Sequence, residues 1–331
     1  MNRRIGLALV LCMTGTGCSG MQSGSSASSI LPTNAAAFGR PRAQHVSWMA
    51  GGIAKQDLLY VTNGNGEVTV YRYWKHTLVG VLTDFSQPMG ECADGGGNVY
   101  ITDYAAQEIL EYAHGGTKPI GKFNDAPDSP YACAIDPGTG NLAVANDDGA
   151  SQPGDIAIWE NGSGSPTRYT DSLLYSFDGC AYDGSGNLLV TNGGRYPYGV
   201  SFAWLPKPGS KLIDINVPAP NPSEKWGGIA GIQWDGKYFA LDAYYIYRIS
   251  LIHGQAYYVG YTQLDSASNG PYWFYNNQPG AQATQVVGGL RGNSSNYVNI
   301  WHYPAGGEPI AEISHGVDRP FGVTISLKQN E

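Results

Sequence analysis

Charged residues are scarce in this chain. Lys, Arg, Asp and Glu make up 14% of its 331 residues, against about a quarter in an average domain. The formal net charge is −8, and Lys and Arg gather nowhere into a basic patch. Because proteins that bind a nucleic-acid backbone need clustered positive charge, we expect no nucleic-acid partner.

Helical periodicity is also missing. After the N-terminus, no apolar pattern with helical spacing continues beyond about two turns. Instead the chain has 46 glycines, roughly twice the usual share, and aromatic residues make up 12% of it, with 23 Tyr and 8 Trp. Turn-forming glycines and strand-forming aromatic residues together predict an all-β protein.

Long apolar runs are absent as well. The N-terminal run, Ile5–Met13, follows Arg3 and Arg4 and has nine residues, too few to cross a bilayer. Its length and its basic flank are those of a secretory signal. We therefore predict a signal peptide over residues 1–17, and we find no later segment that could span a membrane.

The four residues at the end of this signal, Gly15-Thr16-Gly17-Cys18, resemble a bacterial lipobox. The resemblance implies that Cys18 is acylated and becomes the mature N-terminus; an ordinary cleaved signal without a lipid is the alternative. Residues 18–44 are small and polar and predict a flexible tether. The expected location is the outer membrane or periplasm as a lipoprotein, touching the membrane only through its lipid, or otherwise outside the cell.

Five Asn or Asp residues mark a repeat. Each ends a short apolar run and precedes a second run, at spacings of 40, 43, 46 and 50 residues. They are Asn63, Asp103, Asn146, Asn192 and Asp242. A period of this length, built from strands alone, is typical of β-propeller blades, because one blade cannot bury both of its faces without neighbours.

A further strand precedes most of these pairs, as in Pro88–Asp94 and Pro130–Asp136, and a Gly-Asn turn follows it. The last copy, Pro320–Ser326, has no second strand after it, whereas LLYVT at residues 58–62 has no innermost strand before it. We predict that these two segments pair and close the ring. Counting second strands gives a six-bladed propeller of four-stranded antiparallel blades, in a domain of residues 45–331.

Three families share these motifs. The segment from Pro88 to Asp94, followed by Gly-Asn-Val-Tyr-Ile-Thr-Asp, resembles the NHL repeat, and Leu59-Tyr-Val-Thr-Asn63 resembles the YVTN repeat. Six blades are similar to the gluconolactonase-like propellers. That last resemblance implies a divalent-metal site formed by Glu91 with Asn146, Asn192 and Asp242, although the chain lacks the Asp-Pro-x-x-Arg and Pro-Asn-Gly segments of those enzymes.

Catalytic signatures are few. No two of the six histidines have metal-ligand spacing, and Gly162-Ser-Gly-Ser-Pro166 departs from the serine-hydrolase elbow at its last position. The five repeated Asn and Asp residues should surround one mouth of the central channel, where their oxygens could hold Ca²⁺ or another divalent cation. The alternative is that they only form turns.

Two innermost-strand residues depart from the repeat. Glu91 stands where we align Cys133, Cys180, Ile232, Phe274 and Val323, so its carboxylate is paired, titrated upward by burial, or a ligand. Trp273 aligns with small residues such as Gly90. With Tyr272 and Tyr275 beside it, it could stack on a sugar ring or plug the channel.

The cysteines that remain beyond Cys18 are Cys92, Cys133 and Cys180. Cys92 sits one residue later in its repeat than the other two and therefore points to the opposite face of its strand. Cys92 and Cys133 could then meet across two neighbouring blades and form a disulfide; three buried thiols are the alternative.

These observations predict a tethered propeller that binds a protein, a carbohydrate or a small molecule, and that acts as a monomer. A metal-dependent lactonase-like hydrolase, with its site in the channel, is the competing hypothesis. The position of Glu91 relative to the channel separates the two.

Overall fold

A computed structural model describes most of the chain after residue 45. Residues 1–45, 148–152, 173, 193–199, 208, 220–225, 227–228, 230, 243–244, 266–271, 276–280, 290–295 and 329–331 lie outside its description. The predicted signal peptide, Cys18 and the whole of the predicted tether fall in the first of these ranges. Within the described part, no helix has the length and apolar character needed to cross a bilayer.

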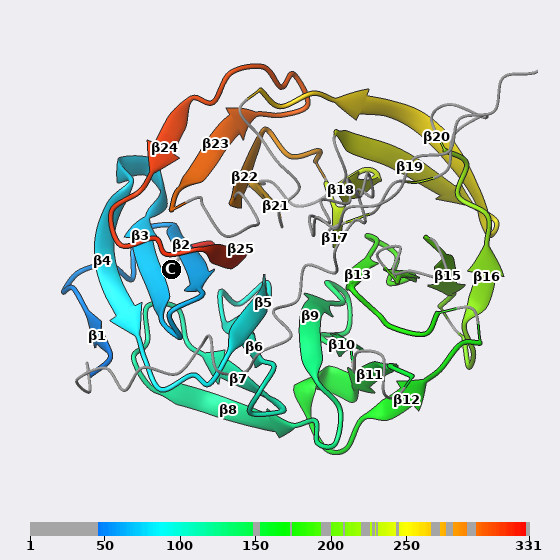
Figure 1. The fold of residues 1–331 in the computed structure, drawn as a ribbon, viewed down its shortest axis with the longest axis horizontal. Helices are drawn as coiled ribbons and strands as arrows, with labels where there is room; N and C mark the ends of the chain where they lie inside the picture. Colours follow the sequence, from blue (N-terminus) through cyan, green and yellow to red (C-terminus); the bar gives the residue numbers. More distant parts are fainter. Residues whose placement is uncertain are drawn as a thin grey trace, which may run out of the picture. The chain divides into compact units, whose positions relative to one another are not determined.

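The domain is a ring of six antiparallel sheets, each one a blade (Figure 1). Blade 1 contains β1 (Trp48–Met49), β2 (Leu58–Asn63), β3 (Val68–Arg72), β4 (Thr77–Leu82) and β25 (Pro320–Ser326). Blade 2 contains β5 (Pro88–Ala93), β6 (Val99–Asp103), β7 (Glu108–Tyr112) and β8 (Pro119–Asn124). Blade 3 contains β9 (Pro130–Ile135), β10 (Leu142–Asn146), β11 (Ile156–Trp159) and β12 (Thr167–Tyr169).

The second half of the ring repeats this order. Blade 4 contains β13 (Gly179–Tyr182), β14 (Leu188–Thr191), β15 (Phe202–Leu205) and β16 (Ile213–Ile215). Blade 5 contains β17 (Gly231–Trp234), β18 (Phe239–Asp242), β19 (Ile246–Ile252) and β20 (Gln255–Thr262). Blade 6 contains β21 (Tyr272–Tyr275), β22 (Gln285–Gly289), β23 (Val298–His302) and β24 (Ala311–Ile313). The predicted all-β, six-bladed fold is confirmed.

The ring closes through the two ends of the domain. β25 pairs antiparallel with β2, from Leu58 opposite Ser326 to Asn63 opposite Pro320, and Figure 1 shows this C-terminal strand beside β2 at the inner end of blade 1. The predicted closure is therefore confirmed. The two-residue strand β1 adds a fifth strand at the outer edge of the same blade.

Each interface between neighbouring blades holds its own cluster of buried side chains. Between blades 1 and 2, for example, Tyr60 and Val70 pack against Ile101 and Leu110. Successive residues of a strand point to opposite faces of the blade. In β2, Tyr60 therefore packs on blade 2, and the preceding residue, Leu59, packs on blade 6. This alternation explains why the second strands are apolar at nearly every position.

Candidate functional site

The innermost strands β5, β9, β13, β17, β21 and β25 form the wall of the central channel. Their register is fixed by their pairing with the second strands. Glu91 lies opposite Ile101 of β6, as Cys133 lies opposite Val144 and Cys180 opposite Val190. In blades 1 and 5, the matching residues are Val323 and Ile232. Glu91 is therefore the carboxylate at a position that is otherwise apolar or thiol in these blades.

The register corrects the predicted alignment of blade 6. Gly289 pairs with Val298, the first residue of β23, as Thr62 pairs with Val68, the first residue of β3. Gly288, one residue before Gly289, therefore corresponds to the second-strand residue opposite Glu91 in blade 2. Because Tyr272 pairs with Gly288, Tyr272 and not Phe274 takes the Glu91 position. Trp273 stands two places further along the strand than predicted, where Cys92 stands in blade 2.

Small residues allow the innermost strands to approach each other. A Cβ atom on Gly322 would lie 2.3 Å from the carbonyl oxygen of Met89, and one on Gly90 would lie 2.6 Å from that of Tyr131. Gly231 occupies the same register position in blade 5, but a Cβ there would meet no atom within 4 Å. The ring is thus close-packed near Gly322 and Gly90 and open near Gly231.

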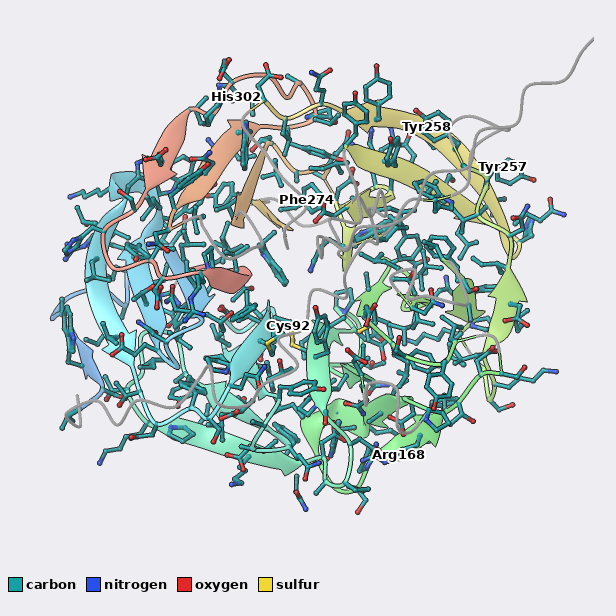
Figure 2. The ribbon with its side chains drawn as sticks, in the orientation of Figure 1. Cys92, Arg168, Tyr257, Tyr258, Phe274 and His302 are labelled. Atoms are coloured by element: carbon teal, nitrogen blue, oxygen red, sulfur yellow. A yellow bond between two sulfur atoms is a disulfide. The ribbon has the colours of Figure 1, made fainter. Side chains whose placement is uncertain are left out.

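A pocket of about 60 Å³ opens at this level of the channel. Its lining residues lie on or directly beside eight strands that belong to all six blades, and Glu91, Asp178 and Asp242 are the acidic groups among them. Its apolar wall includes Met89, Ile232, Phe274, Phe321 and Val323. Figure 2 shows Phe274 on the inner side of the ring. The pocket combines an apolar wall with carboxylates contributed by separate blades.

Glu91 is the most unusual of these groups. It is only 5% exposed, and neither carboxylate oxygen has a hydrogen-bond partner within the described structure. The neighbouring hydroxyl of Thr62 donates instead to the carbonyl oxygen of Met89 at 2.6 Å. Burial, which penalises the charged form, raises the pKa of Glu91 to about 8, and the nearby backbone and hydroxyl of Thr62 only partly oppose this rise. The carboxyl group is therefore mostly neutral at pH 7 and lacks the counter-charge that buried acids usually have.

Four of the five repeated Asn and Asp residues are not among the residues that line this pocket. Asn63 donates to Val61 and Thr69 and accepts from the backbone of Asp318. Asp103 accepts from the backbone N–H groups of Ser86 and Gln87, each at 2.7 Å. These local bonds are those expected of turn-forming residues.

Asn146 and Asn192 also bond close to their own turns. The Asn146 amide donates to Asp155 Oδ1 at 2.7 Å, and Asn192 Oδ1 accepts from the backbone N–H of Ser201 at 2.8 Å. Neither residue is among those that line the pocket. The two amides therefore hold loops, which argues against the metal set that the gluconolactonase resemblance implied.

Asp242 is different because it occupies another register position. It lies opposite Gly231, as Thr191 lies opposite Gly179 and Thr62 opposite Gly322. Asp242 thus replaces the threonine of the repeat and not its Asn, and its side chain reaches the pocket wall. Across the described residues, no three His, Cys, Asp or Glu side chains come together as a metal-binding group.

The predicted aromatic channel residues have separate places. Trp273 packs against the core between blades 6 and 1 and also against the core between blades 2 and 3, so its indole reaches across the channel. Tyr275 is buried, stacks on Tyr73 with ring centroids 4.8 Å apart, and donates to Asp57. Tyr275 is therefore a core residue. The side chain of Tyr272 lies outside the described part.

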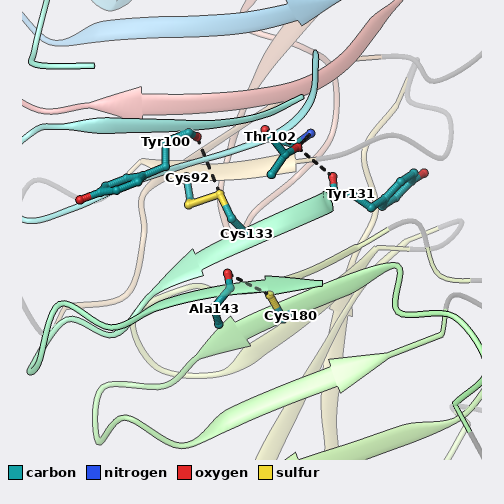
Figure 3. Close-up of a disulfide and its surroundings, with 8 residues drawn as sticks. Cys92, Tyr100, Thr102, Tyr131, Cys133, Ala143 and Cys180 are labelled. Atoms are coloured by element: carbon teal, nitrogen blue, oxygen red, sulfur yellow. Dashed lines mark hydrogen bonds between the residues drawn. A yellow bond between two sulfur atoms is a disulfide. The ribbon is translucent and has the colours of Figure 1, made fainter. Parts of the chain in front are cut away.

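Cys92 and Cys133 are joined by a disulfide, with Cα atoms 5.7 Å apart (Figure 3). This bond ties β5 to β9 directly beside Glu91. Cys180 is a free, buried thiol that lines the pocket, and burial raises its pKa to about 12. A thiol that stays protonated is a poor nucleophile.

Sequence reasoning did not identify Asp178 and Phe321 as residues that line the channel pocket. Asp178 directly precedes the innermost strand of blade 4, where Met89, Tyr131 and Phe321 stand in blades 2, 3 and 1. An acid among such apolar residues was a visible signal of the same kind as Glu91.

Comparison with known proteins supports the fold. No protein family matches the chain, and no curated protein matches its sequence. Among solved structures, a chain from a nidogen–laminin complex aligns with a TM-score of 0.60 and 16% identity, covering 83% of this chain and 99% of that one. A functionally unknown protein from Desulfotomaculum acetoxidans DSM 771 aligns with a TM-score of 0.54 and 10% identity, covering 83% and 100%. At such identities the likeness establishes the β-propeller fold alone.

Proposed function

We propose that this protein is an exported, lipid-tethered propeller that binds a small ligand at the mouth of its central channel. The observation that carries the proposal is the pocket in the channel wall, which is lined by the buried carboxylate of Glu91, a group without a hydrogen-bond partner among the described residues. Concave sites with an apolar wall and a few convergent polar groups are the usual ligand sites of proteins. The tether and export follow from residues 1–44 as argued above.

Binding is favoured over catalysis by the chemistry of the pocket wall. Its described lining residues include no Ser, His or Lys, so no nucleophile and base stand together there. One lining cysteine, Cys133, is in a disulfide, and the other, Cys180, has a thiol that stays protonated. The remaining groups can hold a ligand, but they do not form an acyl-transfer site.

The proposal is tested on the mature protein in two steps. Mass spectrometry of the N-terminus should find an acylated Cys18; an unmodified N-terminus beyond that residue would reject the tether and leave export intact. A thermal-shift screen of small polar and cationic compounds should then find stabilising ligands. Gly231→Val, which adds a side chain where there is open space, should abolish their effect.

The competing hypothesis is a divalent-metal-dependent, lactonase-like hydrolase, and Glu91 in the channel is the observation that favours it. Such an enzyme would hold its metal through Glu91 and neighbouring oxygens, including Asp242. It predicts hydrolysis of lactones or esters that a chelator stops and Ca²⁺ restores. Melting curves that coincide in chelator and in Ca²⁺, together with no hydrolysis, would remove this alternative.

A further inference from the structure

We propose that the ligand of the channel pocket carries a small primary ammonium group, which pairs with the Glu91 carboxylate while its alkyl part lies on the apolar wall. This inference rests on the proposed function, because it names the chemical class of the ligand at that same site. It goes further by fixing the sign of the ligand's charge, its size and the residue that recognises it.

The first argument is the missing partner of Glu91. Innermost strands of neighbouring blades show Val323 and Cys133 at this position, so the fold does not need an acid here. A buried carboxyl group with two unbonded oxygens costs stability. A ligand that donates N–H groups to those oxygens would supply the hydrogen bonds and the opposite charge that the described protein residues do not.

The second argument is the sign of the charge around the pocket. Glu91, Asp178 and Asp242 are acidic, and no Lys, Arg or His is among the described lining residues. An anionic ligand would meet like charge in a partly desolvated space, which is unfavourable. A cation would be attracted by each of these groups.

The third argument is the shape and polarity of the space. About 60 Å³ is room for roughly four water-sized groups, and Met89, Ile232 and Val323 give it an apolar surface. The rings of Phe274 and Phe321 also line it, and aromatic rings attract cations. A Ca²⁺ ion takes about six to eight oxygen ligands, whereas an alkylammonium ion needs few acceptors and an apolar wall.

Binding of such a ligand must displace the Glu91 proton. Because the pKa of Glu91 is raised to about 8, the group is protonated near neutral pH and must ionise to pair with the ammonium. Among the described residues, Tyr60 lies close enough to interact electrostatically with Glu91, and Cys180, Asp178 and Asp242 are the other titratable groups that line the same pocket. Tyr60 and Cys180 have pKa values raised to about 12, so neither ionises in the same range. Affinity should therefore rise about tenfold per pH unit up to about pH 8 and then level off.

The experiment uses three probes of equal size: propylammonium, 1-propanol and propionate. Calorimetric titration of the mature protein at about pH 6, 7 and 8 should show binding of propylammonium alone, tightening about tenfold per pH unit with release of one proton. Glu91→Gln should weaken propylammonium binding at least about tenfold at the highest pH and remove its pH dependence. Gly231→Val should abolish binding of every probe, while Gly95→Val, at another glycine with open space around it, should leave binding unchanged.

The outcomes separate this inference from the proposed function. If 1-propanol binds as tightly as propylammonium, or if Glu91→Gln binds propylammonium like the wild type, the ammonium inference is overturned. The channel would remain a ligand site if Gly231→Val still abolished that binding. If none of the probes binds, the ammonium inference falls, and a ligand from the wider thermal-shift screen would be needed to sustain the proposed function.

Discussion

Glu91 and Asp125 are both buried carboxylates, but their surroundings are opposite. Asp125, in the loop between β8 and β9, accepts a bond from Arg168 at 2.7 Å, and the same guanidinium bonds Asp155 and contacts Asp128. Figure 2 shows Arg168 at the outer rim of the ring, whereas Glu91 belongs to the channel wall. One buried acid thus has a cation from its own chain, and the other has none among the described residues that line its pocket.

The two pKa values reflect this difference. Burial raises the pKa of Asp125 to about 6, and Arg168 limits the rise. Burial raises the pKa of Glu91 to about 8, with no cation to oppose it. A protein that buries an acid for structure supplies a counter-charge or hydrogen-bond donors, as Arg168 does for Asp125. The absence of one in the channel is therefore the stronger indication of a ligand.

The largest expected effect comes from Glu91→Gln. The pKa of Glu91 in the folded protein is raised above its ordinary value, so its burial favours the protonated form. The folded wild type should accordingly lose stability as pH rises from about 4.5 to about 8, by up to about 4 kcal/mol. Glu91→Gln should lack this loss, and the gap between the two unfolding free energies should grow with pH.

Denaturant unfolding of both proteins across this pH range measures that gap. A constant difference between wild type and Glu91→Gln would mean that Glu91 does not titrate in the folded protein. The proposed difference between the raised pKa of Glu91 and that of Asp125 would then not hold.

Arg168→Met removes the cation from the other acid. Because it leaves Asp125 and Asp155 without their partner, we expect a loss of about 3 kcal/mol at pH 7. Lys122→Met is the matched control, since Lys122 is largely exposed in its ion pair with Glu108 and should matter by less than about 0.5 kcal/mol. Equal melting temperatures for the two variants would contradict a structural role for the Arg168 cluster.

The glycine positions sharpen the comparison within the channel wall. Gly322→Ala would place a methyl group against the Met89 carbonyl oxygen and should cost about 2 kcal/mol, whereas Gly231→Ala should cost little. The melting temperatures of the two variants, each compared with the wild type, measure these two losses of stability. If Gly231→Ala proved the more harmful, the open space assigned to blade 5 would be wrong.

Asp103→Asn gives the smallest expected effect, about 1 kcal/mol. Asp103 is a third kind of buried acid, because backbone N–H groups of Ser86 and Gln87 bond both of its oxygens. An amide keeps only one acceptor, so one of these bonds is lost. A Ca²⁺-dependent melting shift in the wild type that Asp103→Asn removes would show, against this expectation, that the residue binds a metal.

The sequence was sufficient for the fold because repeats carry fold information at many positions. The spacing of the Asn and Asp turns predicted propeller blades, and the count of second strands predicted six of them. The unpaired Pro320–Ser326 segment predicted the closure. Opposite strand faces likewise placed Cys92 towards Cys133. Each of these inferences used only the alternation of a strand and the order of the blades.

The site was harder to predict because it depends on single-residue register. Blade 6 has two glycines, Gly288 and Gly289, where other blades have larger residues. The alignment of blade 6 with the other blades, and with it the register of Trp273, could therefore not be determined from sequence alone. Asp242 looked like a turn residue although it stands one position earlier in the repeat. A one-residue slip reverses the face to which a side chain points, so a fold can be predicted well while its channel is not.

The pairing of β2 with β25 also governs when the ring can form. These strands are separated by nearly the whole domain, and all six residues of β2 are buried in the finished protein. Until β25 is available, the edge of β2 that faces the channel therefore has no strand to pair with. An exposed, apolar edge of this kind is a template for aggregation. Blade 1 therefore keeps an aggregation-prone edge until its final strand pairs, whichever blades have already folded.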